Sequence, residues 1–172
     1  MSIGFYQIII LIYPFTYVTI GIKAKYFIES RMTAKIQGVR IMISTKGRYA
    51  LRVMIDLARN SGEGYIPLKD IAERGQISKK YLEIIVRELV GAKLLTGVSG
   101  KGGGYRLSRA PEDYSVGEIL EVTEGSLAVV ACLANGAQEC PRATGCDTLP
   151  MWSELNGIIH DYFYKKKLSD LL

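Results

Sequence analysis

Histidine and cysteine, which often act as catalytic bases, nucleophiles or metal ligands, are scarce in this sequence of 172 residues, which contains one histidine and three cysteines. With a single imidazole, no nucleophile and base can be paired. No glycine-rich loop between a strand and a helix ends in Lys-Ser or Lys-Thr, as a phosphate-cradling loop would. Three is also an odd number, and the cysteines have no partners elsewhere in the chain, which disfavours a disulfide framework. The sequence therefore does not favour an enzyme or a disulfide-stabilised fold.

Charge is missing from the twenty residues Ile3–Ile22, which is long enough to span a bilayer. Basic residues follow it and would hold the remaining chain on the cytoplasmic side. However, Gln7 and Pro14 interrupt the apolar run, and a self-contained module begins at Met42. We therefore interpret residues 1–41 as an apolar extension produced by a misassigned start, with a membrane anchor as the alternative. In both cases the body of the protein is expected in the cytoplasm.

The remaining charge is divided between two halves. Residues 42–110 contain thirteen Lys and Arg against six Asp and Glu, a net charge of +7, whereas residues 111–172 contain four against ten, a net charge of −6. A polyanion would attract the first half and be repelled by the second. The distribution predicts that one end of the molecule approaches nucleic acid.

All three cysteines lie in one loop, with seven residues between Cys132 and Cys140 and five between Cys140 and Cys146. Thiolates gathered in a loop are soft metal ligands. Structural zinc sites normally show close C-x2-C pairs, which are absent here, whereas iron–sulfur clusters tolerate wider spacing. We favour a cluster over zinc or plain reduced thiols. A fourth ligand is not evident, although Glu139 and Asp147 adjoin cysteines, and His160 is interpreted as a half-exposed residue on a helix flank.

The basic half shows the pattern of a helix-turn-helix. Ser44 can cap a helix to about Arg59, a short helix follows over residues 68–74, and Ser78 can cap a third helix to about Val90. The third helix has a predicted buried stripe of Leu82, Ile85, Val86 and Leu89. Its outward candidates for DNA contact are Ser78, Lys79, Lys80, Tyr81, Glu83 and Arg87.

Two strand-like pieces, residues 95–99 and 105–108, flank Gly100-Lys101-Gly102-Gly103-Gly104. A glycine-rich tip between strands predicts a hairpin that can lie close to a sugar–phosphate backbone. Lys101 and Arg106 are the expected phosphate contacts. The hairpin would form the wing of a winged helix-turn-helix.

In the acidic half, Ser115 can cap a helix to about Glu124, and Thr148 can cap a longer helix to about Lys167. An apolar stripe on the longer helix suits either packing against the chain's own body or pairing with a second copy. We predict a homodimer, because two-fold DNA sites favour dimers. The stripe consists of Trp152, Leu155, Ile159, Tyr162 and Phe163.

Four segments together resemble a known family: MISTKGRYAL at 42–51, ISKKYLE at 77–83, GKGGGY at 100–105, and the three-cysteine loop before a helix that bears Trp152. This combination is similar to the Rrf2 (BadM/IscR/NsrR) family of bacterial transcription regulators. The resemblance implies a winged-helix homodimer on a two-fold operator, with Lys80, Tyr81 and Glu83 at groove-reading positions. It also implies that Cys132, Cys140 and Cys146 hold a [2Fe-2S] or [4Fe-4S] cluster.

The fourth ligands known in this family are not matched by position. Leu149 stands where cluster-biogenesis regulators have a histidine, and Arg48 stands where some nitric-oxide sensors have an aspartate. The first cysteine gap also differs from the five residues common in those branches. The resemblance therefore leaves the cluster type and the signal open.

The expected fold is mainly α, a winged helix-turn-helix with a small β-hairpin wing and a long C-terminal dimerisation helix. We expect a DNA-binding module over 42–110, a connecting helix and cysteine loop over 111–147, and a dimerisation helix with a tail over 148–172. The main hypothesis is a repressor or dual regulator whose cluster senses redox state, nitric oxide, iron or cluster status. The alternatives are a cluster-free regulator controlled by thiol oxidation or a partner protein, and a membrane-tethered iron–sulfur redox protein.

Overall fold

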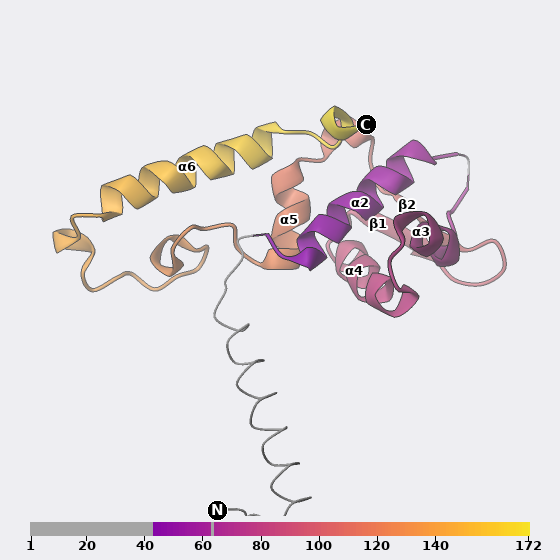
Figure 1. The fold of residues 1–172 in the computed structure, drawn as a ribbon, viewed down its shortest axis with the longest axis horizontal. Helices are drawn as coiled ribbons and strands as arrows, with labels where there is room; N and C mark the ends of the chain where they lie inside the picture. The colour runs from indigo at the N-terminus through magenta and orange to yellow at the C-terminus, as the bar shows by residue number, and fades with distance from the viewer. Residues whose placement is uncertain (1–42, 63) are drawn as a thin grey trace, which may run out of the picture. The chain divides into compact units, whose positions relative to one another are not determined.

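A computed structural model of the chain describes residues 43–62 and 64–172 (Figure 1). The predicted extension over residues 1–41, with its apolar stretch, lies outside these residues. Helices and a two-stranded antiparallel hairpin make up the described part, which confirms the expected mainly α, winged fold. The elements are α2 (Thr45–Arg59), α3 (Leu68–Gly75), α4 (Lys79–Gly91), β1 (Leu95–Val98), β2 (Gly104–Leu107), α5 (Val116–Glu124) and α6 (Leu149–Lys165).

Helix α2 begins where the sequence predicts. The Ser44 hydroxyl accepts hydrogen bonds from the backbone N–H groups of Lys46 and Gly47, which would otherwise lack partners in the first turn. The helix ends at Arg59, as predicted. Its buried apolar residues recur at helical spacing: Ala50, Val53, Met54, Leu57 and Ala58.

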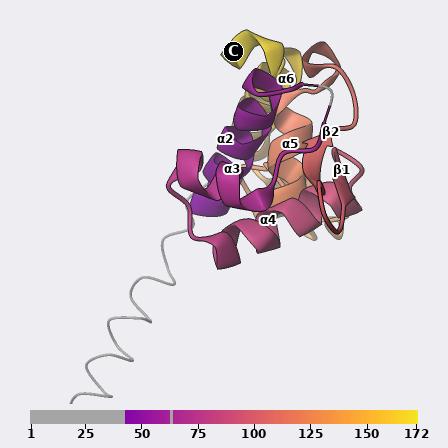
Figure 2. The ribbon, with the colours of Figure 1, turned by 90° about the vertical axis from the view of Figure 1, so that its right-hand side faces the viewer.

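Helices α3 and α4 form the predicted helix-turn-helix, which lies beside α2 in Figure 2. The turn between them is made by Gln76, whose φ of 51° is left-handed, although a glycine precedes it. The Ser78 hydroxyl then accepts a hydrogen bond from the Tyr81 N–H and caps α4. The predicted stripe of α4 is fully buried and consists of Leu82, Ile85, Val86 and Leu89. The opposite side of this helix is therefore available for contact.

The wing is anchored to the segment before α3. Strands β1 and β2 pair in the register Leu95↔Leu107 to Val98↔Gly104. Beyond this pairing, Tyr105 exchanges two backbone hydrogen bonds of 2.9 Å with Ile66. A side chain at Gly104 would collide with the Ile66 carbonyl, and its φ of 156° also favours glycine. The last glycine of the loop therefore allows a third chain segment to pair with the wing.

The C-terminal tail returns to the core of the helix-turn-helix. Leu168 is completely buried in the same apolar cluster as residues of α2, α3 and α4. Its N–H donates to the Tyr114 carbonyl at 3.0 Å, and the Val116 N–H donates to the Lys166 carbonyl at 2.8 Å. These bonds explain why α6 ends at Lys165 rather than near Lys167 as expected.

Helix α5 is capped as predicted, and α6 is not. The Ser115 hydroxyl accepts a hydrogen bond from Glu118 N–H, and Gly125, with φ of 82°, ends the helix. Thr148 occupies the N-cap position of α6 but has helical backbone angles, and its side chain makes no capping hydrogen bond. The Thr148 hydroxyl lies instead 3.5 Å from the Cys146 sulfur.

Candidate nucleic-acid interface and cysteine loop

One side of α4 presents polar side chains beyond the buried stripe. Ser78, Lys79, Lys80, Glu83 and Arg87 are exposed. Lys80, Glu83 and Arg87 recur at helical spacing, so they share one side of the helix. This arrangement gives α4 a mixed-charge surface able to contact phosphates and base edges.

Tyr81 lies differently from the other candidates for DNA contact. It is half-buried and packs against the core, and its ring meets the Tyr49 ring edge-on with the two ring centroids 5.9 Å apart. The Arg52 guanidinium lies over the Tyr49 ring, 5.5 Å from its centroid, and donates a hydrogen bond to the Gly75 carbonyl. Sequence reasoning missed Tyr49 and Arg52, and the Tyr and Arg three residues apart on α2 were the available signal.

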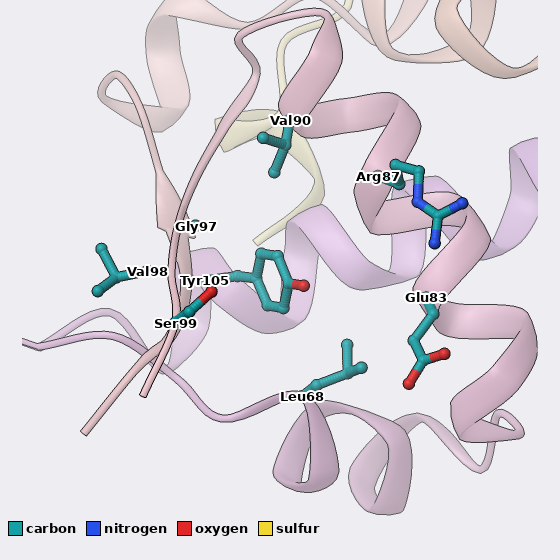
Figure 3. Close-up of a pocket in the computed structure, with 8 residues that line it drawn as sticks. All are labelled: Leu68, Glu83, Arg87, Val90, Gly97, Val98, Ser99 and Tyr105. Carbon is teal, nitrogen blue, oxygen red and sulfur yellow. The ribbon is translucent and has the colours of Figure 1, made fainter. Parts of the chain in front are cut away.

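A groove separates α4 from the wing, and Figure 3 shows Glu83 and Arg87 of α4 on one side and the strands on the other. Its volume is about 440 Å³. Both charged side chains were predicted for DNA contact, whereas the wing residues that complete the groove were not. The lining consists of Leu68, Glu83, Arg87, Val90, Gly97, Val98, Ser99 and Tyr105.

The tip of the wing presents Lys101. This residue is exposed between Gly100 and Gly102, which have φ values of 100° and 79°. Two left-handed glycines leave the backbone at the tip free of bulky side chains. Arg106, the second predicted phosphate contact, stacks on Tyr65 at 4.8 Å and is therefore held at the base of the wing rather than at its tip.

The cysteine loop connects α5 to α6 without regular structure beyond two short 3₁₀ turns, Ala131–Leu133 and Ala143–Gly145. Cys132 is exposed, and Cys140 and Cys146 are half-exposed. The hydrogen bond with Thr148 lowers the pKa of the Cys146 thiol. Early in the loop, the Val129 N–H donates to the Asn156 side chain at 3.2 Å.

The three thiols have the right chemistry for an iron–sulfur cluster but are not assembled to hold one. Among residues 43–62 and 64–172, no group of three or more His, Cys, Asp or Glu side chains is placed to bind a metal ion. His160, which was expected to be half-exposed on a helix flank, is exposed on α6 and stacks on Tyr164 with the ring centroids 4.3 Å apart. The described arrangement therefore brings neither the three cysteines nor a fourth ligand into one site.

The predicted apolar stripe of α6 is divided between two sides of the helix. Trp152, Ile159 and Phe163 are half-buried, and Phe163 packs on α5. Leu155 and Tyr162 are exposed. Together with Met151 and Ile158, which were not predicted, they form an outward apolar stripe. The exposed fractions of its side chains are Met151 52%, Leu155 39%, Ile158 59% and Tyr162 64%. These residues follow one another at spacings of four, three and four, and this helical spacing in the sequence is the signal for the second stripe.

The winged fold that carries the exposed polar side of α4 is shared with a known protein family. Residues 43–172 match the Rrf2 family, which is described as "Iron-dependent Transcriptional regulator". The chain belongs to the Rrf2 family. An Rrf2 chain with this surface is a DNA-binding transcription regulator and not an enzyme, as its relatives are HTH-type transcriptional regulators.

Curated relatives and solved structures place this Rrf2 chain near two kinds of regulator. It is 36% identical over 130 residues to the HTH-type transcriptional regulator IscR of Aliivibrio salmonicida, covering 76% of each chain. It resembles the T. potens IscR structure with a TM-score of 0.59 at 33% identity, covering 79% of this chain and 88% of that one. The structure of CymR, the global cysteine regulator of B. subtilis, gives 0.60 at 34%, covering 75% and 94%.

No helix within the described part of the chain is both long enough and apolar enough to cross a membrane. The candidate anchor over residues 3–22 lies outside that part.

Proposed function

We propose that this Rrf2 protein is a cytoplasmic homodimer that binds a two-fold operator in double-stranded DNA, with repression as the expected mode. Its operator affinity would be controlled at Cys132, Cys140 and Cys146 by a [2Fe-2S] or [4Fe-4S] cluster. The observation that carries the proposal is the joining of two features in one unit. The α4–wing surface of a helix-turn-helix regulator is connected through α5 to a loop that holds every cysteine of the chain.

For DNA binding, we propose residues 42–110 as the reading module. Helix α4 would enter the major groove, where Glu83 and Arg87 face the groove beside the wing. Lys79, Lys80 and Lys101 are exposed cations suited to phosphate contact, and the net charge of +7 in this part favours approach to a polyanion. The cation–π contact with Tyr65 would position the Arg106 guanidinium against the sugar–phosphate backbone of the DNA.

For dimerisation, we propose α6 within residues 148–172. The stripe of Met151, Leu155, Ile158 and Tyr162 exposes apolar surface along nearly the whole helix. An apolar stripe of this length favours contact with a second copy, which would place two reading modules on a two-fold site. Trp152, Ile159 and Phe163 would support the interface from the side of α6 that packs inward.

The dimer can be tested by sedimentation. We expect Ile158→Lys to shift the full-length protein toward monomer and to weaken operator binding, because it places a charge in the centre of the stripe. Ser153→Lys adds the same charge elsewhere on the exposed surface of α6 and should leave the dimer intact. An unchanged dimer in Ile158→Lys would contradict this interface.

For the cluster, the support is chemical. Three thiolates are typical ligands of iron–sulfur centres, and the family description names iron dependence. Because the described loop does not gather the cysteines, cluster binding requires residues 125–147 to rearrange. The decisive experiment is anaerobic purification followed by a visible spectrum with iron and sulfide analysis. We expect a coloured protein that contains iron and acid-labile sulfide, and loss of both when the cysteines are replaced by alanine.

A second candidate keeps the DNA binding and replaces the cluster with thiol chemistry or a partner protein. Two observations favour it. The three thiols are not gathered into one site, and a hydrogen bond lowers the pKa of the Cys146 thiol, which favours its reactive thiolate form. The resemblance to a cysteine regulator agrees with it. A colourless protein that binds DNA, with affinity that changes on thiol oxidation, would support this candidate over the cluster.

A further inference from the structure

The last residue of α5, Glu124, lies at the N-terminus of α2. One oxygen, Oε1, accepts three hydrogen bonds: from the Ser44 N–H at 3.0 Å, the Ser44 hydroxyl at 2.8 Å and the Gly47 N–H at 3.1 Å. The donors are eighty and seventy-seven residues away in the sequence. The Gly47 N–H is shared between the Ser44 hydroxyl and Glu124. A carboxylate in this position also suits the positive end of the helix dipole. We call this set of contacts the Glu124 clamp.

Gly47 provides the space for the clamp. This residue is buried, and a methyl group in place of its hydrogen would collide with Glu124 Oε1 and lie 3.2 Å from the side chain of Leu120. Gly47 is within α2 and lacks a left-handed φ, so its backbone does not require glycine. Alanine is also the better helix former. Close approach of Glu124 is therefore the physical reason for glycine at this position.

The same helical turn is connected to α4. Lys46 Nζ lies 3.1 Å from both carboxylate oxygens of Glu88, on the half-buried side of α4. Glu88 is one residue after Arg87, which lines the groove beside the wing. A displacement of the first turn of α2 would therefore alter a charged contact next to the DNA-reading surface.

On its other side the clamp adjoins the cysteine loop. Gly125, whose φ is 82°, follows Glu124 directly and redirects the chain into the loop. Six residues lie between Gly125 and Cys132, and the loop is held to α6 through Val129 and Asn156. A rearrangement that gathers or modifies the cysteines would act on this short segment and hence on the end of α5.

We propose that Glu124 is a positioning residue that couples the state of the cysteine loop to α4 through the first turn of α2. With the clamp closed, Ser44 and Gly47 fix that turn, and Lys46 holds Glu88. When the loop pulls the end of α5 away, the turn loses three hydrogen bonds and the α4 surface shifts. This coupling rests on the proposed control of operator affinity by the cysteine loop, and the mechanism is the same for a cluster or for thiol chemistry.

The test compares operator affinity with the loop in two chemical states. The full-length protein is purified anaerobically and one half is alkylated with iodoacetamide, which modifies only the loop because the chain has no cysteines outside it. The DNA is a duplex selected by the protein from a random pool. We expect alkylation to change the affinity of the unaltered protein by about tenfold, within the usual range of coupling between sites. In Glu124→Ala, which removes the accepting oxygen, and in Gly47→Ala, the affinities of the two states should lie within about twofold of each other.

Glu118→Ala is the matched control, since it truncates the same residue type on α5 but removes a contact to Arg109 outside the clamp. It should keep the full response to alkylation. Gly47→Ala retains the Glu124 carboxylate but places a methyl group where Oε1 lies, so it disrupts the clamp by collision. Urea unfolding of both clamp variants and of the control identifies conditions under which all of them stay folded during the DNA titrations. A response equal to that of the unaltered protein in both clamp variants would overturn the coupling and leave loop control intact.

Amide hydrogen exchange supplies a readout that does not depend on DNA. Alkylation should accelerate exchange at Ser44 and Gly47 in the unaltered protein, because both N–H groups donate to Glu124. Unchanged exchange at these amides, with a changed operator affinity, would mean that the signal follows another route and would refute the clamp as its carrier. If alkylation changes neither exchange nor affinity, loop control itself is wrong, and the coupling falls with it.

Discussion

Replacing Leu168 by alanine should destabilise the DNA-binding unit, although this residue is close to the end of the chain. Its side chain is completely buried in the core shared by α2, α3 and α4. Its backbone N–H bonds to the Tyr114 carbonyl, and the neighbouring Lys166 carbonyl accepts from Val116. The tail is thus fastened at Leu168 itself and two residues before it.

The expected cost follows from that fastening. Leucine-to-alanine changes at buried sites cost about 2–5 kcal/mol, with the larger values where the surroundings cannot collapse into the cavity. Because the backbone at Leu168 is fixed by the flanking hydrogen bonds, we expect about 3–5 kcal/mol. Total stabilities of domains are about 5–15 kcal/mol, so this change removes a large share.

Urea unfolding followed by circular dichroism measures the effect, and Leu172→Ala is the matched control in the same tail. The Leu172 side chain is 49% exposed, so its loss should cost no more than about 0.5 kcal/mol. The midpoint should shift for Leu168→Ala while the slope of the transition stays constant. Equal midpoints for the two variants would refute the inclusion of the tail in the core.

Three further predictions concern the wing base, the wing tip and α6. Tyr114 accepts two backbone hydrogen bonds and donates to the Leu94 carbonyl, each at 2.8 Å, so Tyr114→Phe should cost about 1–3 kcal/mol in urea unfolding, and a neutral effect would contradict these bonds. Lys101→Ala should reduce the salt dependence of DNA binding by about one unit of log–log slope in anisotropy titrations, whereas an unchanged slope would exclude a phosphate contact. Burial, together with the hydrogen bond to Glu121, raises the pKa of Tyr164 to about 12. Its stabilising contribution is therefore complete below the unfolded pKa of about 10 and is lost as pH rises through about 12, so urea unfolding over that window should show a steeper decline for the unaltered protein than for Tyr164→Phe.

Local patterns in the sequence were sufficient to predict most of the fold. The buried stripe of α4 recurs at helical spacing, and Ser44, Ser78 and Ser115 each stand at the capping position that the structure assigns to them. These signals depend only on neighbours within a few residues. The glycine-rich wing tip is local in the same sense, since it requires only a turn between two short strands.

Contacts between distant segments could not be predicted in this way. Leu168 lies in a short tail between three lysines and Ser169-Asp170, and its spacing to Leu171 and Leu172 does not indicate that it returns to the core of α2, α3 and α4. Glu124 is one of several acids on α5, and only the folded chain brings it to Ser44. The α6 stripe was partly misassigned to one surface because Phe163 and Tyr162 are adjacent in sequence but lie on different sides of the helix.

The placement of the cysteines relative to α5 and α6 determines where a signal can act at low cost. The C-terminal part of α6 is fastened along α5, because Ser115 pairs with Lys167 and the Tyr164 hydroxyl donates to Glu121, one turn before Glu124, at 2.6 Å. The loop joins the end of α5 to the start of α6 and, among the described residues, contributes little to the core. Segments with few buried contacts rearrange at the smallest free-energy cost. A change in thiol state would therefore rearrange the loop before it disturbs α5, and the first residue of α5 that it reaches is Glu124.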